Sequence, residues 1–355
     1  TTLFRSFLLI VIITVLISLG GTTFGLAEET IALYPILVPV FMAAGYDALV
    51  CIAALYMGSS IGTMFSTVNP FSSVIASNAA GTTFTAGLGM RTAGLIIATI
   101  FTIIYIVKYG KKIKKDPTKS LIYDQKKEIE EKFLKNYEEK VIPEFTFRRK
   151  LMLLVFGSAF AIMIWGVSSK EWWFTEMTTL FLAVGIALGV ISGMGEKEFV
   201  NKFVGGAADL IGVALVIGVA RAINLIMENG LISDSILHFS SNAVQGMNPY
   251  IFIIVMLLLF IILGFFIPSS SGLAVLSMPI MAPLADAVGL PRDVIVSAYQ
   301  YGQGLIAFIT PTGLILATLA MVDVTYDKWL KFIMPLMGYT AAFAGLMLLI
   351  QVAFK

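Results

Sequence analysis

The sequence GGTTFGLAEETIALYPILVPVFMAAG (residues 20–45) decides the fold, because its helix-breaking residues recur 244 positions later in GFFIPSSSGLAVLSMPIMAPLADAVG (264–289). Pro lacks a backbone N–H and Gly tolerates unusual dihedral angles, so both residues break or bend helices. Matching breaks inside two apolar segments are typical of secondary transporters, in which broken helices of two repeats meet near the membrane midplane. The matched pairs are Gly20 and Gly264, Pro35 and Pro279, Pro39 and Pro283, Gly45 and Gly289, and Gly58 and Gly302.

The composition indicates a polytopic helical membrane protein. Hydrophobic residues make up 58% of the 355 residues and charged residues only 13%, whereas soluble domains carry about 25% charged residues. Several apolar runs come near the ~20 residues that cross a bilayer. These runs are 151–165, 180–191, 210–220, 251–267 and 334–354. The single Cys51 and the single His238 form no disulfide framework and no metal-ligand spacing, so no cofactor is expected.

One loop predicts the topology. Between Lys108 and Lys150 lie 14 of the 24 Lys and Arg residues and 8 acidic residues, which gives this loop a net charge of +6. Short loops rich in Lys and Arg stay in the cytoplasm. The protein is therefore predicted to lie in the plasma membrane of a prokaryote, with this loop on the cytoplasmic side. Its middle part, 126–140, has Glu and Lys at i,i+4 spacing, as in Glu128 and Lys132, and predicts a solvated helix. Binding of anionic lipid by the same charges is the alternative.

Counting spans outward from this loop gives two repeats of opposite orientation. The first hairpin opens to the cytoplasm and the second to the exterior, which is an inverted-topology arrangement. The second repeat has scaffold spans before its hairpin that the first lacks, so about a hundred N-terminal residues are expected to precede this chain. The predicted parts are a first repeat 1–107 (hairpin 3–45, broken helix 46–86, helix 90–107), a basic linker 108–150, and a second repeat 151–355 (scaffold helices 151–229, hairpin 249–289, broken helix 291–324, helix 328–354).

Four segments are predicted to leave the helical conformation at membrane depth. Backbone of this kind is tolerated only where protein or a water-filled cavity surrounds it. The segments are the two hairpin tips, 20–30 and 266–272, and the two helix interruptions, 65–71 and 309–313. Their Ser, Thr, Asn and Gly residues offer hydroxyls, amides and free N–H groups. Half-helix N-termini suit a carboxylate, and unwound carbonyls suit a cation such as sodium. If no ligand binds, the same residues satisfy helix ends.

Three intramembrane charges are the sharpest candidates for substrate contact. A carboxylate at membrane depth costs about 2.5–3.5 kcal/mol on insertion scales and is therefore usually functional. Glu28 and Glu29 would hold amino groups while Ser269–Ser271 hold a carboxylate; the alternative is that one Glu caps the following half-helix. Arg221 would meet a substrate carboxylate or pair within the scaffold, and Gln303 would line the site.

These segments resemble the YfcC/ArcD-like members of the four-carbon-dicarboxylate anaerobic carrier family, within the ion transporter superfamily. The resemblance rests on GGTTFGLAEET (20–30), GTMFSTVNPF (62–71), FFIPSSSGLAVLSMPIMAPLAD (265–286) and GLIAFITPTG (304–313). It implies an elevator-type transporter, expected as a homodimer, in which each repeat has a re-entrant hairpin and a broken helix. The ligands it implies are Thr22, Thr23 and Glu28 in the first tip, Ser269, Ser270 and Ser271 in the second, and Thr67, Asn69, Thr310 and Thr312 in the broken helices, with sodium near Thr67, Asn69 and Thr310 or protons as the coupling ion.

The acidic tip favours a cationic amino acid, carried in exchange as for arginine and ornithine, over a dicarboxylate, because a dianion beside Glu28 and Glu29 would be repelled. A C4-dicarboxylate carrier remains the alternative, as does a membrane subunit of a multi-component uptake system. No Walker motif occurs in the sequence. An intramembrane enzyme would need a nucleophile–base or metal constellation that one His and one Cys do not provide. The expected partners are a small-molecule substrate and the lipid bilayer, with no nucleic acid.

Overall fold

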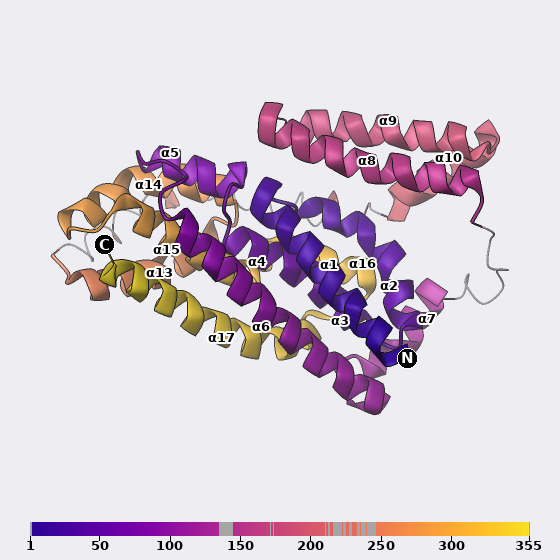
Figure 1. Ribbon diagram of the computed structural model, residues 1–355, viewed down its shortest axis with the longest axis horizontal. Helices are drawn as coiled ribbons and strands as arrows, with labels where there is room; N and C mark the ends of the chain where they lie inside the picture. Colours follow the sequence, from indigo (N-terminus) through magenta and orange to yellow (C-terminus); the bar gives the residue numbers. More distant parts are fainter. Residues whose placement is uncertain are drawn as a thin grey trace. The chain divides into compact units, whose positions relative to one another are not determined.

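The computed structural model describes residues 2–134, 145–170, 172, 174–209 and 246–354, with isolated helical positions between 211 and 239. In these residues the chain is all-helical, with turns between the helices and no strand (Figure 1). Six of the described helices are long and apolar enough to cross a membrane, which agrees with the composition. The chain divides into two compact units, Thr1–Phe133 with Val213–Lys355, and Leu134–Gly212.

The first hairpin and the first broken helix follow one another in the chain. The hairpin consists of α1 (Thr2–Phe24), the 3₁₀ turn η1 (Glu28–Leu33) and α2 (Tyr34–Ala43). The broken helix begins with α3 (Ala48–Ile52), the π-helical turn η2 (Ala53–Met57) and α4 (Gly58–Met64). It is interrupted at 65–69 and resumes as η3 (Pro70–Val74) and α5 (Ile75–Ala79). Pro70 fits here because the first residue of a helix needs no N–H donor.

The second hairpin and the second broken helix are built in the same way. The hairpin consists of α13 (Pro249–Phe266) and α14 (Ser270–Ala287), with its tip at 267–269. The broken helix consists of α15 (Arg292–Ala307) and α16 (Leu314–Val322), with its interruption at 308–313. The predicted interruptions of both helices are therefore present in the structure.

The helix boundaries repeat with the offset found in the sequence. The broken helices begin at Ala48 and Arg292, and the second arms of the hairpins end at Ala43 and Ala287. The second halves of the broken helices begin at residues 70 and 314. Each of these pairs differs by 244 positions. The glycines at 45 and 289, just after the hairpins, have positive φ angles of 82° and 73°, a conformation that favours Gly.

The two halves pack against each other in a matching pattern. In each half, the first arm of the hairpin packs against the first part of its own broken helix: α1 against α4, and α13 against α15. The second arms cross over, so that α14 packs against α5 and η3, and α2 packs against α16. The first parts of the two broken helices, α4 and α15, also touch. This crossed packing brings both hairpin tips and both interruptions into one core.

Two long helices complete this unit. They are α6 (Leu88–Lys115) and α17 (Tyr326–Ala353), which lie along each other in Figure 1 and contact one another. Aromatic rings fill the contact, since Phe332 meets Tyr105 and Tyr109 edge-on with ring centroids 5.3 and 5.1 Å apart. Edge-to-face pairs of this kind add to the stability gained from buried apolar area.

The first part of the basic linker is docked rather than fully solvated. After the 3₁₀ turns η4 (Pro117–Lys119) and η5 (Tyr123–Gln125), helix α7 spans Lys126–Leu134. Ile129 is buried, and Lys132 forms an ion pair of 2.6 Å with Asp323 after α16, instead of the predicted pair with Glu128. The predicted helix is present over Lys126–Leu134 with most of its residues exposed, but it is not solvated on all sides, because Ile129 and Lys132 have tertiary partners. Residues 135–140 of the predicted helix lie outside the described residues.

A second anchor holds the start of the linker to the first broken helix. The Asp47 carboxylate caps α3 by accepting a hydrogen bond of 3.0 Å from the Val50 N–H. It also accepts hydrogen bonds from the hydroxyls of Ser120 (2.6 Å) and Tyr109 (2.8 Å). Burial raises the pKa of the Asp47 carboxyl above its usual value, and these hydrogen bonds oppose that rise.

The second unit consists of three described helices, α8 (Phe147–Lys170), α9 (Phe174–Ser192) and α10 (Glu196–Asp209). Helices α8 and α9 pack together as a pair, and Phe160 contacts Phe181 edge-on at 5.5 Å between ring centroids. This unit contains part of the segment predicted as scaffold helices.

Candidate functional site

The first hairpin tip is bonded to the first helix interruption. The Thr22 hydroxyl accepts a hydrogen bond of 2.9 Å from the Thr67 N–H, and the two Thr hydroxyls are 3.1 Å apart. The Val68 N–H donates to the Thr22 carbonyl at 3.3 Å. The Asn69 side-chain amide donates to the Gly21 carbonyl at 3.0 Å. The structure therefore brings together three of the predicted site residues, Thr22, Thr67 and Asn69.

Asn69 also determines where the helix resumes. Its side-chain oxygen accepts a hydrogen bond of 2.8 Å from the Phe71 N–H and thereby caps the start of η3. Gly25 lies against this cap with φ +78°, and a Cβ atom there would lie 2.9 Å from the Phe71 ring. Only Gly fits at this position, because both the backbone conformation and the space exclude a side chain.

The two acidic residues of the first tip have different surroundings. The Glu29 carboxylate accepts a hydrogen bond of 3.2 Å from the Ala27 N–H, which closes the tip. The Glu28 side chain is exposed and forms no ion pair among the described residues. The predicted capping role thus fits Glu29, and Glu28 is the carboxylate that remains available. The Thr23 hydroxyl donates to the Leu19 carbonyl at 2.6 Å.

The second tip presents a capped helix N-terminus. The Ser269 hydroxyl accepts a hydrogen bond of 3.1 Å from the Gly272 N–H at the start of α14, and the Ser271 hydroxyl lies 3.5 Å from it. Helix N-termini carry a partial positive charge that favours an anion. The Tyr299 hydroxyl holds this tip from α15 by donating to the Ser270 carbonyl at 2.6 Å.

Each tip is held by the broken helix of its own repeat at an equivalent position. The Gln303 side chain donates to the Pro268 carbonyl at 3.5 Å, and the Ser59 hydroxyl donates to the Leu26 carbonyl. Positions 59 and 303 differ by 244. Gln303 was predicted to line the site, and the structure places it against the second tip.

The second interruption is enclosed by aromatic donors. Three successive carbonyls, at Ala307, Phe308 and Ile309, accept hydrogen bonds from side chains. The donors are Tyr56 (2.7 Å), Trp329 (2.8 Å) and Tyr326. The Thr310 hydroxyl turns back onto the Ile306 carbonyl at 2.8 Å, whereas the Thr312 hydroxyl is buried without a hydrogen-bond partner. Of the two predicted Thr ligands, Thr312 has the free hydroxyl.

A serine cluster lies behind the first interruption, and the sequence analysis did not single it out. The Gln300 amide donates to the hydroxyls of Ser66 and Ser73, each at 2.8 Å. These residues are fully buried, and Gln300 comes from the other repeat. Gln300 stands 244 positions after Tyr56, which reaches the opposite interruption. Both side chains therefore connect the two broken helices from equivalent positions.

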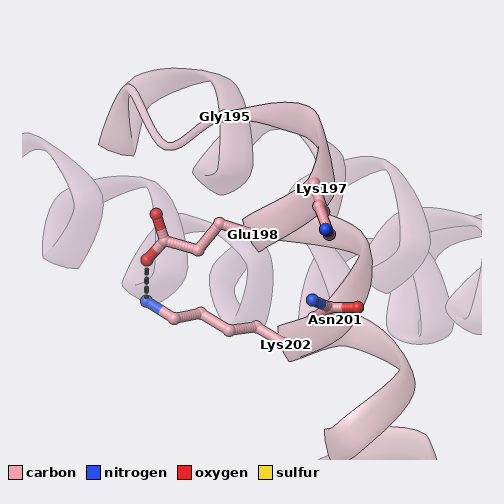
Figure 2. A pocket seen from close by; sticks show the side chains of 5 residues that line it. All are labelled: Gly195, Lys197, Glu198, Asn201 and Lys202. Carbon is pink, nitrogen blue, oxygen red and sulfur yellow. Dashed lines mark ion pairs between the residues drawn. The ribbon is translucent and has the colours of Figure 1, made fainter.

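Two further positions complete the placement of the predicted residues. Arg221, like His238, lies outside the described residues. Among the described residues no group of three His, Cys, Asp or Glu side chains could hold a metal ion. A shallow surface depression in the second unit is lined by Gly195, just before α10, and by Lys197, Glu198, Asn201 and Lys202 of the first half of α10, with Glu198 and Lys202 paired at 2.7 Å (Figure 2). It contains none of the predicted site residues.

Long apolar helices, paired hairpins and interrupted helices define a polytopic membrane protein with the architecture of a transporter. The chain belongs to the C4-dicarboxylate anaerobic carrier (DcuC) family, whose model matches residues 1–353. A protein of Haemophilus influenzae described as uncharacterized is 51% identical over 349 residues, which cover 98% of this chain and 69% of that protein. The putative basic amino acid antiporter YfcC of Escherichia coli is 34% identical over 336 residues, which cover 91% of this chain and 66% of YfcC.

The solved structure of MtrF from Neisseria gonorrhoeae, described as illuminating a class of antimetabolite efflux pumps, is similar in fold. It has a TM-score of 0.52 and 18% identity, and the match covers 97% of this chain and 74% of MtrF. The predicted resemblance to YfcC-like carriers is confirmed, and the protein is a multi-pass membrane protein of a transporter family. A prokaryotic inner membrane is consistent with these relatives.

Proposed function

We propose that the protein is a secondary active transporter of an amino acid, and that a cationic amino acid such as arginine or ornithine is the favoured substrate, carried in exchange. The observation that carries this proposal is the difference between Glu28 and Glu29. Glu29 closes the first tip by capping the Ala27 N–H, while Glu28 is exposed beside the same tip. An accessible carboxylate at this depth attracts a cation and repels a dianion.

The opposite tip supplies the complementary chemistry. The Ser269–Ser271 hydroxyls and the N-terminus of α14 suit the carboxylate that every amino acid carries. A zwitterion with a second ammonium group would thus lie with its carboxylate at the second tip and its side-chain amine near Glu28. The proposed contacts are Thr22, Thr23, Glu28, Glu29, Thr67, Asn69, Ser269, Ser270, Ser271, Gln303, Thr310 and Thr312, with Arg221 as a further candidate.

The movement that carries the substrate is part of the same proposal. We propose that the two halves are inverted repeats with re-entrant hairpins, and that their core moves as an elevator in a homodimer. The crossed packing of α14 on α5 and of α2 on α16 supports a core that moves as one body. Sodium near Thr67, Asn69 and Thr310, or a proton, is the proposed coupling ion.

The description of one relative agrees with an amino acid substrate, whereas the description of the family favours a dicarboxylate. YfcC, which is 34% identical, is described as a putative basic amino acid antiporter. The family model is described as a C4-dicarboxylate carrier, so a dicarboxylate is the second candidate substrate. It would need a bound cation to offset the charge of Glu28.

Transport by the purified protein in liposomes tests the proposal. We expect exchange of radiolabelled arginine for internal ornithine without any partner protein, and no exchange of succinate. Glu28→Gln should weaken arginine binding by about 10- to 150-fold, which corresponds to the 1.5–3 kcal/mol of a hydrogen bond to a charged group. Glu29→Gln is the matched comparison and should weaken arginine binding less than Glu28→Gln, because the Glu29 carboxylate already accepts a hydrogen bond from the Ala27 N–H. Succinate exchange that survives Glu28→Gln would support the dicarboxylate carrier instead.

A further inference from the structure

The last two turns of α6 carry a row of lysines that the proposed transport site does not use. Four of them are exposed, namely Lys108, Lys111, Lys112 and Lys115. None of the four forms an ion pair among the described residues. Lys114 differs from them, because its amine donates to the Ser6 hydroxyl at 2.6 Å and lies 4.0 Å from the centre of the Tyr46 ring. The four exposed ammonium groups are thus open to a ligand from outside the unit.

The lysines continue a row of exposed apolar residues on the same helix. Helix α6 is long and apolar enough to cross a membrane, and four of its isoleucines are 47–55% exposed, namely Ile96, Ile97, Ile100 and Ile104. Residues three, four and seven positions apart share one face of an α-helix. Lys108, Lys111 and Lys115 follow Ile104 by four, seven and eleven positions, so they lie on the face of the isoleucines. The row that suits lipid tails therefore leads directly into a row of positive charges.

Distance along the helix places the lysines at the level of lipid headgroups. Each residue of an α-helix adds about 1.5 Å along the axis, so Lys108 lies about 6 Å beyond Ile104, and Lys111 about 10 Å beyond it. The headgroup layer on each side of the hydrocarbon core is about 5–8 Å thick. A lysine side chain can also lie along apolar surface with its ammonium group in the polar layer. With Ile104, the last exposed isoleucine, at the edge of the hydrocarbon, these ammonium groups reach the headgroup phosphates.

The helix dipole accounts for only part of this row. Cations stabilise a helix within its last turn, which explains Lys112, Lys114 and Lys115. Lys108 and Lys111 precede that turn. Like charges four residues apart destabilise a helix, and the row contains two such pairs, Lys108 with Lys112 and Lys111 with Lys115. A bound anion between these side chains would remove the repulsion.

We propose that Lys108, Lys111, Lys112 and Lys115 form a docking surface for the headgroups of anionic phospholipids. The ammonium groups bind the headgroup phosphates, and the acyl chains lie along the isoleucine row of α6. Lysine binds phosphate as a point charge, so the surface selects for negative charge rather than for one headgroup structure. The loop after α6 is predicted to face the cytoplasm, and the cytoplasmic leaflet carries anionic lipids. The docking surface belongs to the same compact unit as both hairpins and both broken helices.

The test is the melting temperature of the purified full chain in a neutral detergent, titrated with phosphatidylglycerol or with phosphatidylcholine of the same acyl chains. A ligand that binds only the native state raises the melting temperature by mass action. We expect a saturable rise with phosphatidylglycerol that weakens at high ionic strength, and no such rise with phosphatidylcholine. Inorganic phosphate should give no rise, because it lacks the acyl chains; a rise equal to that with phosphatidylglycerol would contradict a lipid surface. These measurements need no substrate, so their result is independent of the proposed transport.

Two double variants that remove the same charge decide the outcome. Lys108→Gln with Lys111→Gln should weaken phosphatidylglycerol binding about 25-fold, because each lysine near an anionic surface contributes about fivefold, or about 1 kcal/mol. Neither residue lies in the last turn of α6, so the favourable interaction with the helix dipole is kept. Lys127→Gln with Lys197→Gln is the control, because these lysines on α7 and α10 are also exposed; its response should equal that of the wild type. A wild type without a saturable phosphatidylglycerol response, or an equal loss in both double variants, would overturn the proposal.

Discussion

The side chain of Asn69 holds the first hairpin tip to the first helix interruption, and its removal has a calculable cost. Asn69 is 1% exposed, donates to the Gly21 carbonyl and accepts from the Phe71 N–H. In Asn69→Ala, the loss of the helix cap costs about 1 kcal/mol. The Gly21 carbonyl, left buried without its donor, costs about 1–3 kcal/mol more. The junction should therefore be weakened by about 2–4 kcal/mol.

Hydrogen exchange of the tip measures this effect locally. Since each 1.4 kcal/mol is a factor of ten, the loss should raise the opening of the tip about 30- to 700-fold, while exchange in α17 stays unchanged. The amide of Leu26, which donates to the Gly20 carbonyl at 3.3 Å, reports the opening directly. Asn78→Ala, at an exposed position on α5, is the matched control. Tip exchange in Asn69→Ala at the rate of the control would refute the reasoning.

Three further predictions concern packing, the serine cluster and the linker. Gly62→Ala places a Cβ atom against a carbonyl of α1 and should lower the free energy of unfolding, measured by thermal denaturation, by about 1–3 kcal/mol. Gly89→Ala is the control and should leave the free energy of unfolding unchanged, because no atom lies within 4 Å of the added Cβ. Gln300→Leu removes the amide donor from the buried hydroxyls of Ser66 and Ser73 and should lower the melting temperature; an unchanged value would show that the cluster does not bind the repeats together. Lys328 donates to Asp124 at 2.8 Å and holds the pKa of that carboxyl below its usual value of 3.8, so the stabilisation is present above pH 3.8 and lost as the pH falls through the lowered pKa. The stability difference between the wild type and Asp124→Asn should accordingly vanish in acid, and a difference that persists would contradict this assignment.

The positions of the helix breaks were predictable because Gly and Pro affect the backbone conformation at their own position in the chain. Pro70 and Gly313 mark where the helices resume, and these positions depend on dihedral preferences and missing donors rather than on distant contacts. The sequence analysis placed Thr22 and Thr67 in segments that were expected to converge, and the structure shows their hydroxyls 3.1 Å apart. The class of protein was predictable from the composition and the apolar spans, and the family from the resemblance of segments 20–30, 62–71, 265–286 and 304–313.

The roles of individual side chains were not predictable, because they depend on long-range packing. The sequence does not show which of the two neighbouring carboxylates, Glu28 or Glu29, accepts the hydrogen bond from the Ala27 N–H. The burial of Arg91 was not predicted either, because Arg91 is the second residue of the predicted helix 90–107, where an Arg can lie at the membrane surface, whereas α6 begins at Leu88 and Arg91 is 0% exposed. An Arg that follows the apolar residues LGM and precedes an apolar run is the signal that would have identified it.

The two ends of the proposed site differ in both backbone and side chains. The first tip leads into the 3₁₀ turn η1 (Glu28–Leu33), whereas the second leads directly into the N-terminus of α14 at Ser270. The first tip has the exposed Glu28, while position 272 in the second, 244 residues later, is Gly at the start of α14. A ligand with two like charges would be favoured at one tip and repelled at the other. An amino acid with a carboxylate and a distant ammonium group would be favoured at both, so the orientation of the proposed substrate depends on Glu28 at one tip and on the N-terminus of α14 at the other.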